Sequence, residues 1–400
     1  MATLDDAPHQ FEPLLPSEAA QQPLLEQAHD LARSALRLAQ APAPAGLRGL
    51  LRGMNSYYTN RIEGQHTRPL EIAEALRHDF SGNPDLAARQ RLAVAHIDAE
   101  QAIEARFAAP DGARRLYQPE AVTELHRELF GRLPPEDLKT KEGEPIVPGE
   151  IRRRDVSVGA HVAPAFGSLT LLLQRWADVY GGVRRGEAEL LAVAAAHQRL
   201  GWIHPFVDGN GRVMRLHTHG VLAALGYTSG LWSPLRGFAR ASDRYYALLA
   251  AADEPRRGDL DGRGNLSQQA LVDWISFVLE VCQDHVNFMA GLLRLADIER
   301  RIAACLSFEE QTLRSGVRIE ALRPLHYLFV TDASLERGEF KRMLGLGERT
   351  AGSVLKALLD RGLLASESPQ GPLRFGLPLH ALRFYFPALW PEAEADAARA

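Results

Sequence analysis

Helical periodicity is the feature that most constrains the fold of this 400-residue chain. Alternation of polar and apolar residues is found mainly at 151–162, after Pro148-Gly149, and it indicates an extended segment or hairpin. The sequence therefore predicts a mainly α fold with a small β-hairpin. Apolar residues recur at intervals of three and four over 20–40, 88–108, 119–130, 187–201, 211–225, 242–252 and 268–296.

Composition and charge exclude several classes of protein. Lys and Arg number 46 against 50 Asp and Glu, the net charge is −4, and 46% of the residues are hydrophobic, which is typical of a globular chain with adequate cores. A near-neutral chain is not expected to bind nucleic acid or anionic membrane in bulk. No apolar run is long enough to span a membrane, and the polar N-terminus predicts no secretory signal. Two cysteines, Cys282 and Cys305, form no metal-binding or disulfide pattern, so a reducing, cytoplasmic location is expected.

The last hundred residues differ from the rest in charge. Residues 300–390 hold 13 Lys and Arg against 9 Asp and Glu, so this segment is +4 while the remainder is −8. Helices are expected at 321–330, 335–345 and 348–363, followed by a hairpin near Gly371, an order that resembles a winged-helix domain. DNA binding through helix 348–363 and a role in protein interaction or dimerisation both remain open. The charged residues of that helix are Arg349, Lys356 and Arg361 against Glu348 and Asp360.

These patterns predict four parts along the chain. They are an N-terminal helical region (1–110), a core (111–298), a winged-helix-like domain (299–392) and a tail (393–400).

One stretch, IHPFVDGNGRVMR at 203–215, carries the chemistry. Pro205 is expected to hold His204 in an extended conformation, so the preceding helix ends there. Asp208, Gly209 and Asn210 are residue types of turns and helix N-caps, and a second helix is expected to start near 211. The unit is therefore a helix, a tight loop and a helix N-terminus.

A helix N-terminus of this kind binds anions through its free N–H groups and its dipole. Gly209 and Gly211 leave room for the close approach of a phosphate. Arg212 and Arg215 are three residues apart on one helix face and can both reach a polyphosphate. Asp208 beside them would repel a phosphate unless it holds a hard cation such as Mg²⁺.

His204 completes the set, because its side chain can act as a general base near neutral pH. A base, a metal-binding carboxylate, an amide nest and two cations are what the transfer of a phosphate-containing group requires. The sequence has no Walker A pattern and no kinase signature set.

The segment HPFVDGNGRVMR closely resembles the signature of the Fic (Fic/Doc) family, HPFx(D/E)GN(G/K)RxxR. The preceding AAAHQRLGWI resembles the family's lead-in helix, and the resemblance extends over roughly residues 50–285. It implies a helical core that transfers AMP from ATP to a protein hydroxyl with release of pyrophosphate. It also implies that His204 deprotonates the hydroxyl, that Asp208 holds Mg²⁺, and that Arg215 grips the γ-phosphate. The residues implied to cradle the phosphates are Gly209, Asn210, Gly211 and Arg212.

Thr59-Asn60-Arg61-Ile62-Glu63-Gly64 resembles the family's inhibitory motif, (S/T)xxxE(G/N). Thr59 and Glu63 are four residues apart and share one face if the segment is helical. The resemblance implies that Glu63 pairs with Arg215 and blocks productive binding of the γ-phosphate. Alternatively, Glu63 could position water to remove AMP from a modified protein.

Two further segments resemble family elements near the nucleotide. Residues 152–164 resemble a β-hairpin flap that aligns an extended target segment by main-chain hydrogen bonds. The tyrosine pair at 245–246, followed by Asp253, resembles a helix near the nucleotide base, although both tyrosines could instead pack in the core. The nucleotide-site residues implied here are Val156, Ser157, Val158, Gly159, Tyr245, Tyr246 and Asp253.

The expected partners are ATP and a protein substrate of unknown identity. Dimerisation and self-modification are open, with Tyr57 and Tyr58 as candidate acceptors. The alternative functions are transfer of UMP, phosphate or phosphocholine, removal of AMP from a modified protein, and regulation through DNA binding.

Overall fold

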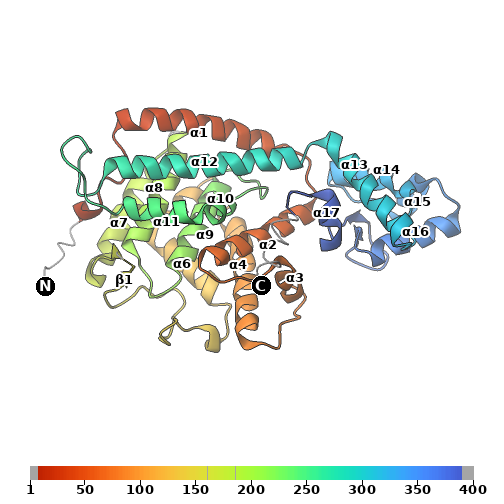
Figure 1. Ribbon diagram of the computed structural model, residues 1–400, viewed down its shortest axis with the longest axis horizontal. Helices are drawn as coiled ribbons and strands as arrows, with labels where there is room; N and C mark the ends of the chain where they lie inside the picture. The colour runs from red at the N-terminus through yellow and green to blue at the C-terminus, as the bar shows by residue number, and fades with distance from the viewer. Residues whose placement is uncertain (1–7, 160, 185, 390–400) are drawn as a thin grey trace. The chain divides into compact units, whose positions relative to one another are not determined.

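The computed structural model describes residues 8–159, 161–184 and 186–389 (Figure 1). These residues form helices joined by loops, together with short two-stranded hairpins, so the predicted mainly α fold is confirmed. The predicted tail at 393–400 lies outside the described residues. Within the described ranges, no helix combines the length and apolarity that crossing a membrane requires.

The chain divides into two compact units. The first contains the residues up to Ala39, Arg52–Thr67 and Glu71–Val286. The second contains Gln40–Leu51, Arg68–Leu70 and the residues from Asn287 onward. All the residues proposed from the sequence for catalysis, nucleotide binding and inhibition belong to the first unit.

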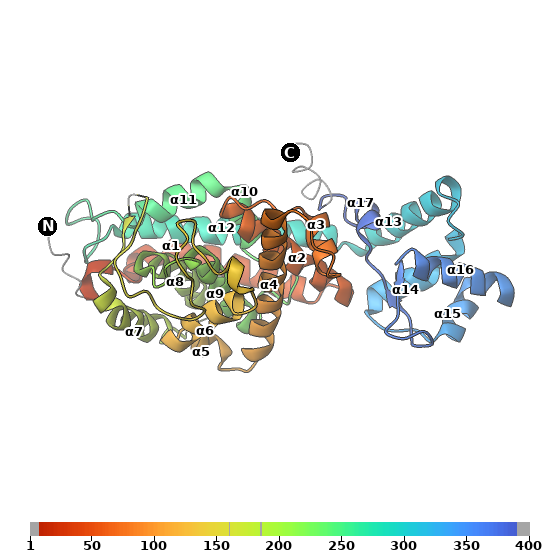
Figure 2. The same cartoon turned by 90° about the horizontal axis from the view of Figure 1, so that it is seen from below.

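Two consecutive helices, α8 (Ala188–Ile203) and α9 (Asn210–Ala224), lie at the centre of the first unit (Figure 2). They pack against each other along their length, and most residues of both are buried. A helix that is buried nearly all round must be covered by other helices on every side. The helices around this pair are α1 (Glu18–Ala39), α4 (Pro84–Arg106), α5 (Gly112–Leu116), α6 (Pro119–Phe130) and α7 (Leu169–Tyr180).

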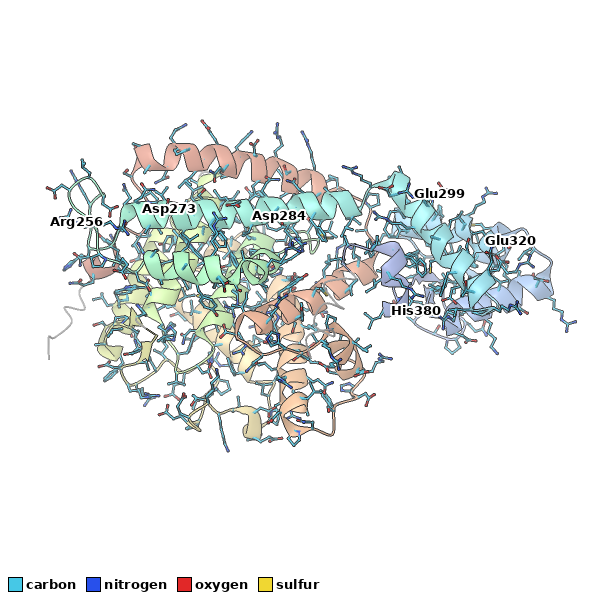
Figure 3. All side chains as sticks on the ribbon, in the orientation of Figure 1. Arg256, Asp273, Asp284, Glu299, Glu320 and His380 are labelled. Carbon is cyan, nitrogen blue, oxygen red and sulfur yellow. The ribbon has the colours of Figure 1, made fainter. Side chains whose placement is uncertain are left out.

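Tryptophans from two helices donate hydrogen bonds to backbone carbonyls of α8. Trp274 of α12 (Gln268–Leu292) donates to the carbonyl of Ala194 at 2.7 Å, and Trp176 of α7 donates to that of Ala196 at 3.0 Å. α12 lies beside α1 (Figure 1), with Ser276 hydrogen-bonded to Gln27. Asp273 and Asp284 of α12, labelled in Figure 3, are exposed. The remaining helices that begin before α12 are η1 (Pro8–Phe11), α2 (Ala45–Ile62), α3 (Pro69–Ala75), η2 (Pro135–Asp137), η3 (Phe166–Ser168), α10 (Leu235–Arg240) and α11 (Ser242–Ala251).

The hairpin predicted at 151–162 is present and short. β1 (Ser157–Val158) pairs antiparallel with β2 (His161–Val162), so that Ser157 lies opposite Val162 and Val158 opposite His161. Gly159 follows β1 with φ of 59°, a conformation that glycine adopts without strain.

The second unit has the element order that the sequence predicts. Three helices, α14 (Leu322–Thr331), α15 (Arg337–Leu344) and α16 (Glu348–Asp360), precede an antiparallel pair, β3 (Leu364–Ala365) and β4 (Arg374–Phe375). Of the cations predicted on the third helix, Arg361 forms a two-pronged ion pair with the buried Glu309, so it is already neutralised within the unit. A winged-helix assignment and DNA binding stay predictions. The other helices of this unit are α13 (Leu295–Ser307), η4 (Phe308–Thr312), η5 (Ile319–Ala321), η6 (Leu379–Ala381) and α17 (Leu382–Tyr385).

Candidate active site

The loop between α8 and α9 begins with a left-handed residue. His204 follows the last residue of α8 with φ 50° and ψ 61°, and its N–H donates to the carbonyl of Leu200 at 3.1 Å. The helix ends where predicted, but the expected extended conformation of His204 is wrong. Proline disfavours the right-handed helical region for the residue before it, and a left-handed residue is a common way to close a helix.

The side chain of Asn210 shapes this loop. Its Oδ1 accepts from the Phe206 N–H at 2.9 Å, and its Nδ2 donates to the Phe206 carbonyl at 2.8 Å. Gly209 has φ of 80°, and a Cβ there would lie 2.3 Å from the Phe130 ring, so glycine is required. α9 therefore starts abruptly at Asn210, and the N–H groups of its first turn have no partner within the helix.

A cavity of about 260 Å³ lies over this helix start. This is slightly below the roughly 300–1,000 Å³ usual for small-molecule sites. Several of the predicted site residues line it together, although they come from β1, α9, α11 and the loops that follow α2, α8 and α11. These residues are Glu63, Val158, His204, Asn210, Gly211, Arg215, Tyr246 and Asp253.

His204 has the protonation state that a general base needs. Burial, reinforced by the nearby His161 and Arg152, lowers the pKa of His204 to about 4. The imidazole is therefore neutral at neutral pH and can accept a proton. Arg152, itself buried, donates from Nε to the His204 carbonyl at 2.8 Å and from its N–H to that of Pro205 at 2.9 Å. Sequence reasoning missed this contribution of Arg152 to positioning the loop.

Arg215 is fully buried and is bound to the end of α2. Its Nη2 lies 2.5 Å from Oε1 of Glu63, and its Nε donates to Oγ1 of Thr59 at 2.8 Å. Burial acts to raise the pKa of Glu63, but the charges of Arg215 and Arg212 outweigh it, so the pKa lies below its ordinary value. Glu63 is therefore ionised at neutral pH, as an ion pair with Arg215 requires.

The same segment also binds the second arginine. Arg212 donates to Oδ1 of Asn60 at 3.3 Å and to Oε1 of Gln65 at 2.8 Å. Sequence reasoning missed Asn60 and Gln65, although both lie within or next to the six-residue motif. Residues 59–65 therefore contact both cations that the sequence assigns to phosphate.

The carboxylate of Glu63 lies against the start of α9. A Cβ at Gly211 would be 2.3 Å from Oε1 of Glu63, so the absence of a side chain at Gly211 is what admits this oxygen. A carboxylate thus occupies the anion-binding end of α9 where the sequence predicts a phosphate. Asp208, half-buried at the same end, accepts from the N–H of Gly209 at 2.5 Å.

The flap is tied to the far side of the cavity through His161. Its Nε2 lies 2.9 Å from the Trp202 carbonyl, and its Nδ1 lies 3.3 Å from Oδ2 of Asp253. Gln198 donates to the other oxygen of Asp253 at 2.6 Å, and burial raises the pKa of that carboxyl group. His161 was not among the predicted site residues, because its partner lies nearly a hundred residues away in sequence.

The two adjacent tyrosines have different environments. Tyr245 is fully buried and hydrogen-bonded to His197 at 3.0 Å, which agrees with the alternative of core packing. Tyr246 lines the cavity, and its hydroxyl donates to the carbonyl of Ile62, the last residue of α2, at 2.8 Å. Tyr57 and Tyr58 are 1% and 2% exposed, so the idea that they are exposed acceptors is wrong for this conformation.

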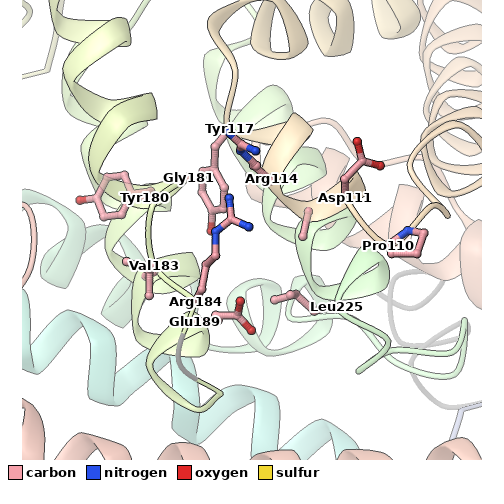
Figure 4. Close-up of a pocket in the computed structure, with 12 residues that line it drawn as sticks. Pro110, Asp111, Arg114, Tyr117, Tyr180, Gly181, Val183, Arg184, Glu189 and Leu225 are labelled. Atoms are coloured by element: carbon pink, nitrogen blue, oxygen red, sulfur yellow. The ribbon is translucent and has the colours of Figure 1, made fainter.

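Other predicted residues lie outside the cavity lining. On the flap, Val156 is half-buried, whereas Ser157 and Gly159 are exposed. A separate cavity of about 340 Å³ is bordered by Arg114, Tyr117, Arg184 and Glu189 (Figure 4). It shares no lining residue with the cavity at α9.

Comparison with known families identifies the helix–loop–helix unit. Residues 116–222, which span the flap, α8, the loop and most of α9, match the Fic/DOC family. This segment of the chain is a Fic/DOC domain. The match includes His204, Asp208 and Arg215, whereas Glu63, Tyr246 and Asp253 lie outside it.

The relatives with curated names include "Protein adenylyltransferase Fic" of Drosophila willistoni and of Drosophila grimshawi. Each is 36% identical to this Fic-domain chain over 134 residues, which is 33% of this chain and 24% or 25% of the relative. The matched part thus spans about a quarter of the length of these relatives.

Solved structures show the fold. A Fic family protein from Desulfovibrio desulfuricans aligns over 92% of this chain and 99% of its own, with a TM-score of 0.55 and 17% identity. Fic-1 of C. elegans (residues 134–508) aligns over 70% of this chain and 74% of its own, with a TM-score of 0.52 and 17% identity. The first of these alignments extends over most of both units.

Proposed function

We propose that this protein is a Mg²⁺-dependent adenylyltransferase that moves AMP from ATP to a Ser, Thr or Tyr hydroxyl of a protein, and that Glu63 holds it inactive. The observation that carries the proposal is that neutral His204, the N-terminus of α9 and Arg215 line one cavity, into which Glu63 also projects. The names of the relatives support adenylyl transfer as the chemistry.

In the proposed reaction, Nδ1 or Nε2 of His204 takes the proton of the target hydroxyl. The oxygen attacks the α-phosphorus of ATP, the bond from that phosphorus to the bridging α–β oxygen breaks, and pyrophosphate leaves. The N–H groups at the start of α9 and the guanidinium of Arg215 hold the phosphates and stabilise the charge that develops on them.

Asp208 fits the role of magnesium ligand. Its carboxylate is half-buried at the phosphate-binding end of α9, and carboxylate oxygen is the donor that Mg²⁺ prefers. When bound there, the ion would neutralise charge on the phosphates. Without it, Asp208 would oppose an incoming polyphosphate.

The inhibitory state follows from the contacts of Glu63. Arg215 cannot clamp a γ-phosphate while its Nη2 is paired with Glu63. The negative carboxylate at Gly211 also repels a phosphate from the same N–H groups. Activation therefore requires Glu63 to leave, whereas the rest of the site is already in place.

The flap supplies a surface for the protein substrate. Val158 and Val162, on adjoining strands, are 48% and 54% exposed. A two-stranded hairpin leaves unpaired N–H and C=O groups along its edge, and an extended peptide can add there. The residues that would align the substrate in this way are Val156, Ser157, Val158 and Gly159.

AMP removal is the second candidate. Ionised Glu63 lines the same cavity as His204, so it could orient a water molecule toward an AMP–protein bond. The two reactions make opposite demands, because addition is limited by Glu63 whereas removal needs it.

The experiment supplies the Glu63→Gly variant with Mg²⁺ and ATP labelled on either the α- or the γ-phosphate. Label retained on protein from α-labelled ATP alone supports AMP transfer, and the Glu63→Gly/His204→Ala variant should retain none. Label from γ-labelled ATP alone would show phosphate transfer and overturn the proposal. Loss of AMP from a modified protein with wild type, but not with Glu63→Gly, would instead support removal.

A further inference from the structure

The inhibitory helix has a second set of polar contacts, two to three turns before Glu63. Arg52 of α2 donates to Oε2 of Glu104, and Asn55 of α2 donates to Oε1 of Glu100 at 3.0 Å. Glu100 and Glu104 are four residues apart on α4, so they lie on one face of that helix. α2 is thereby attached to α4.

The same two carboxylates also hold α9. His219 lies four residues after Arg215, one turn further along α9. Its Nε2 lies 2.9 Å from Oε1 of Glu104 and 3.6 Å from Oε1 of Glu100. Its Nδ1 lies 3.2 Å from the hydroxyl of Ser233. We call the five residues Arg52, Asn55, Glu100, Glu104 and His219 the anchor cluster.

The anchor cluster is buried and balanced in charge. Glu100 and His219 are each 1% exposed. Burial alone would lower the pKa of His219, but Glu100 and Glu104 outweigh it and the pKa is raised. Burial likewise opposes ionisation of Glu104, yet His219 and Arg52 lower its pKa to about 2. Removing one of the charged members therefore leaves an uncompensated buried charge, which is costly.

Glu100, Glu104 and His219 lie close enough together to hold a metal ion, since one donor atom from each lies within 4.8 Å of the others. However, the carboxylates already accept from Arg52 and Asn55, and His219 already bonds Glu104. The cluster is thus a set of ion pairs and hydrogen bonds that joins three helices.

The anchor cluster and the inhibitory contact act on the same two helices. On the side of α2, Arg52 belongs to the anchor cluster and Glu63, directly after the helix, forms the inhibitory contact. On α9, His219 belongs to the anchor cluster and Arg215 forms the inhibitory contact. Eleven residues of helix span about 16 Å, so the two attachments are well separated. A helix fixed at one point can swing about it, whereas a helix fixed at two points keeps its orientation.

We propose that the anchor cluster positions α2 so that Glu63 remains against Arg215, and that loosening the cluster activates the enzyme without any change at Glu63 itself. This inference rests on the proposed function, in which Glu63 is the inhibitor. The cluster residues are positioning residues, since in this structure they line no part of the cavity at α9.

The test compares AMP incorporation by Arg52→Met, Arg52→Lys and a matched control, Arg106→Met. Arg106, in the last turn of α4, forms ion pairs with Glu124 and Glu128, and among the described residues no hydrogen bond or ion pair joins it to α2. Arg52→Met should raise the rate by about fivefold or more, the lower end of typical coupling between sites. Arg52→Lys should restore part of the inhibition, and Arg106→Met should match wild type.

The Glu63→Gly background separates positioning from general loosening. There, Arg52→Met should add no further activity, because the inhibitor it releases is already gone. An increase of the same size in both backgrounds, or wild-type activity of Arg52→Met while Glu63→Gly is active, would overturn the inference.

A second measurement stands even if the proposed function fails and Glu63→Gly is inert. Amide hydrogen exchange of the peptide spanning residues 52–65 should be faster in Arg52→Met than in Arg106→Met or wild type. Equal exchange in all three would overturn the inference whatever the reaction is.

Discussion

Replacing Glu63 by glutamine and then by glycine should raise the affinity for ATP in two steps. ATP must displace Glu63 from Arg215 before its γ-phosphate can bind there, and the displaced contact is a 2.5 Å ion pair. A charge-assisted hydrogen bond of this kind is worth about 1.5–3 kcal/mol. Since about 1.4 kcal/mol is tenfold in affinity, Glu63→Gly should tighten ATP binding by roughly 10- to 100-fold.

Glutamine keeps an acceptor but not the charge. A neutral hydrogen bond is worth about 1 kcal/mol, so Glu63→Gln should retain part of the competition and give an intermediate affinity. Arg215 is buried, so water screens the charge of its guanidinium very little. The affinity for ATP should therefore rise distinctly from wild type to Glu63→Gln and again to Glu63→Gly.

The assay is equilibrium binding of a non-hydrolysable ATP analogue with Mg²⁺, in a His204→Ala background that prevents turnover. AMP serves as the control ligand, because it has no γ-phosphate for Arg215 to bind, so its affinity should rise less than that of the ATP analogue when Glu63 is replaced. Equal affinity of the three proteins for the ATP analogue would refute the reasoning, as would an equal gain for AMP.

Three other outcomes follow from the same contacts. The Glu63→Gly enzyme should keep its activity as the pH falls past 6, where an ordinary histidine titrates. It should lose activity only as the pH falls to about 4 or below, because the pKa of His204 is about 4 while the charge of Glu63, which raises it, is present; a pH–rate profile checks this. Thr59→Val should raise AMP incorporation less than Glu63→Gly does, because Thr59 accepts one hydrogen bond from Arg215 whereas Glu63 carries the charge; a rise equal to that of Glu63→Gly would contradict this. Asp208→Asn should raise the Mg²⁺ concentration needed for half-maximal rate, and an unchanged Mg²⁺ titration would argue against Asp208 as the ligand.

Local patterns in the sequence were sufficient for the two central helices and for the position of the loop between them. The periodicity at 187–201 and 211–225 corresponds to α8 and α9, and the alternation at 151–162 corresponds to the β1–β2 hairpin. These features depend on residues only a few positions apart, so they can be predicted from a single sequence. The conformation of His204 was wrong because the proline rule excludes one region of backbone space without choosing between the remaining ones.

Contacts between distant segments could not be predicted from spacing. The partners of Arg212 come from residues 60 and 65, and Asp253 meets His161 from another helix. Burial is equally non-local, because nothing in the local sequence indicates that Tyr57 and Tyr58 are buried in the folded chain. The anchor cluster combines both difficulties, since its members look like ordinary surface charges on three separate helices.

The central claim is that Glu63 restrains an otherwise complete AMP-transfer site. The most direct test is the initial rate of incorporation of α-phosphate label into protein by wild type and by Glu63→Gly, at equal ATP and Mg²⁺. The account predicts a large increase for Glu63→Gly that shrinks when Arg215→Ala is added, because both the restraint and the γ-phosphate contact pass through Arg215. An unchanged or lower rate in Glu63→Gly would contradict the account.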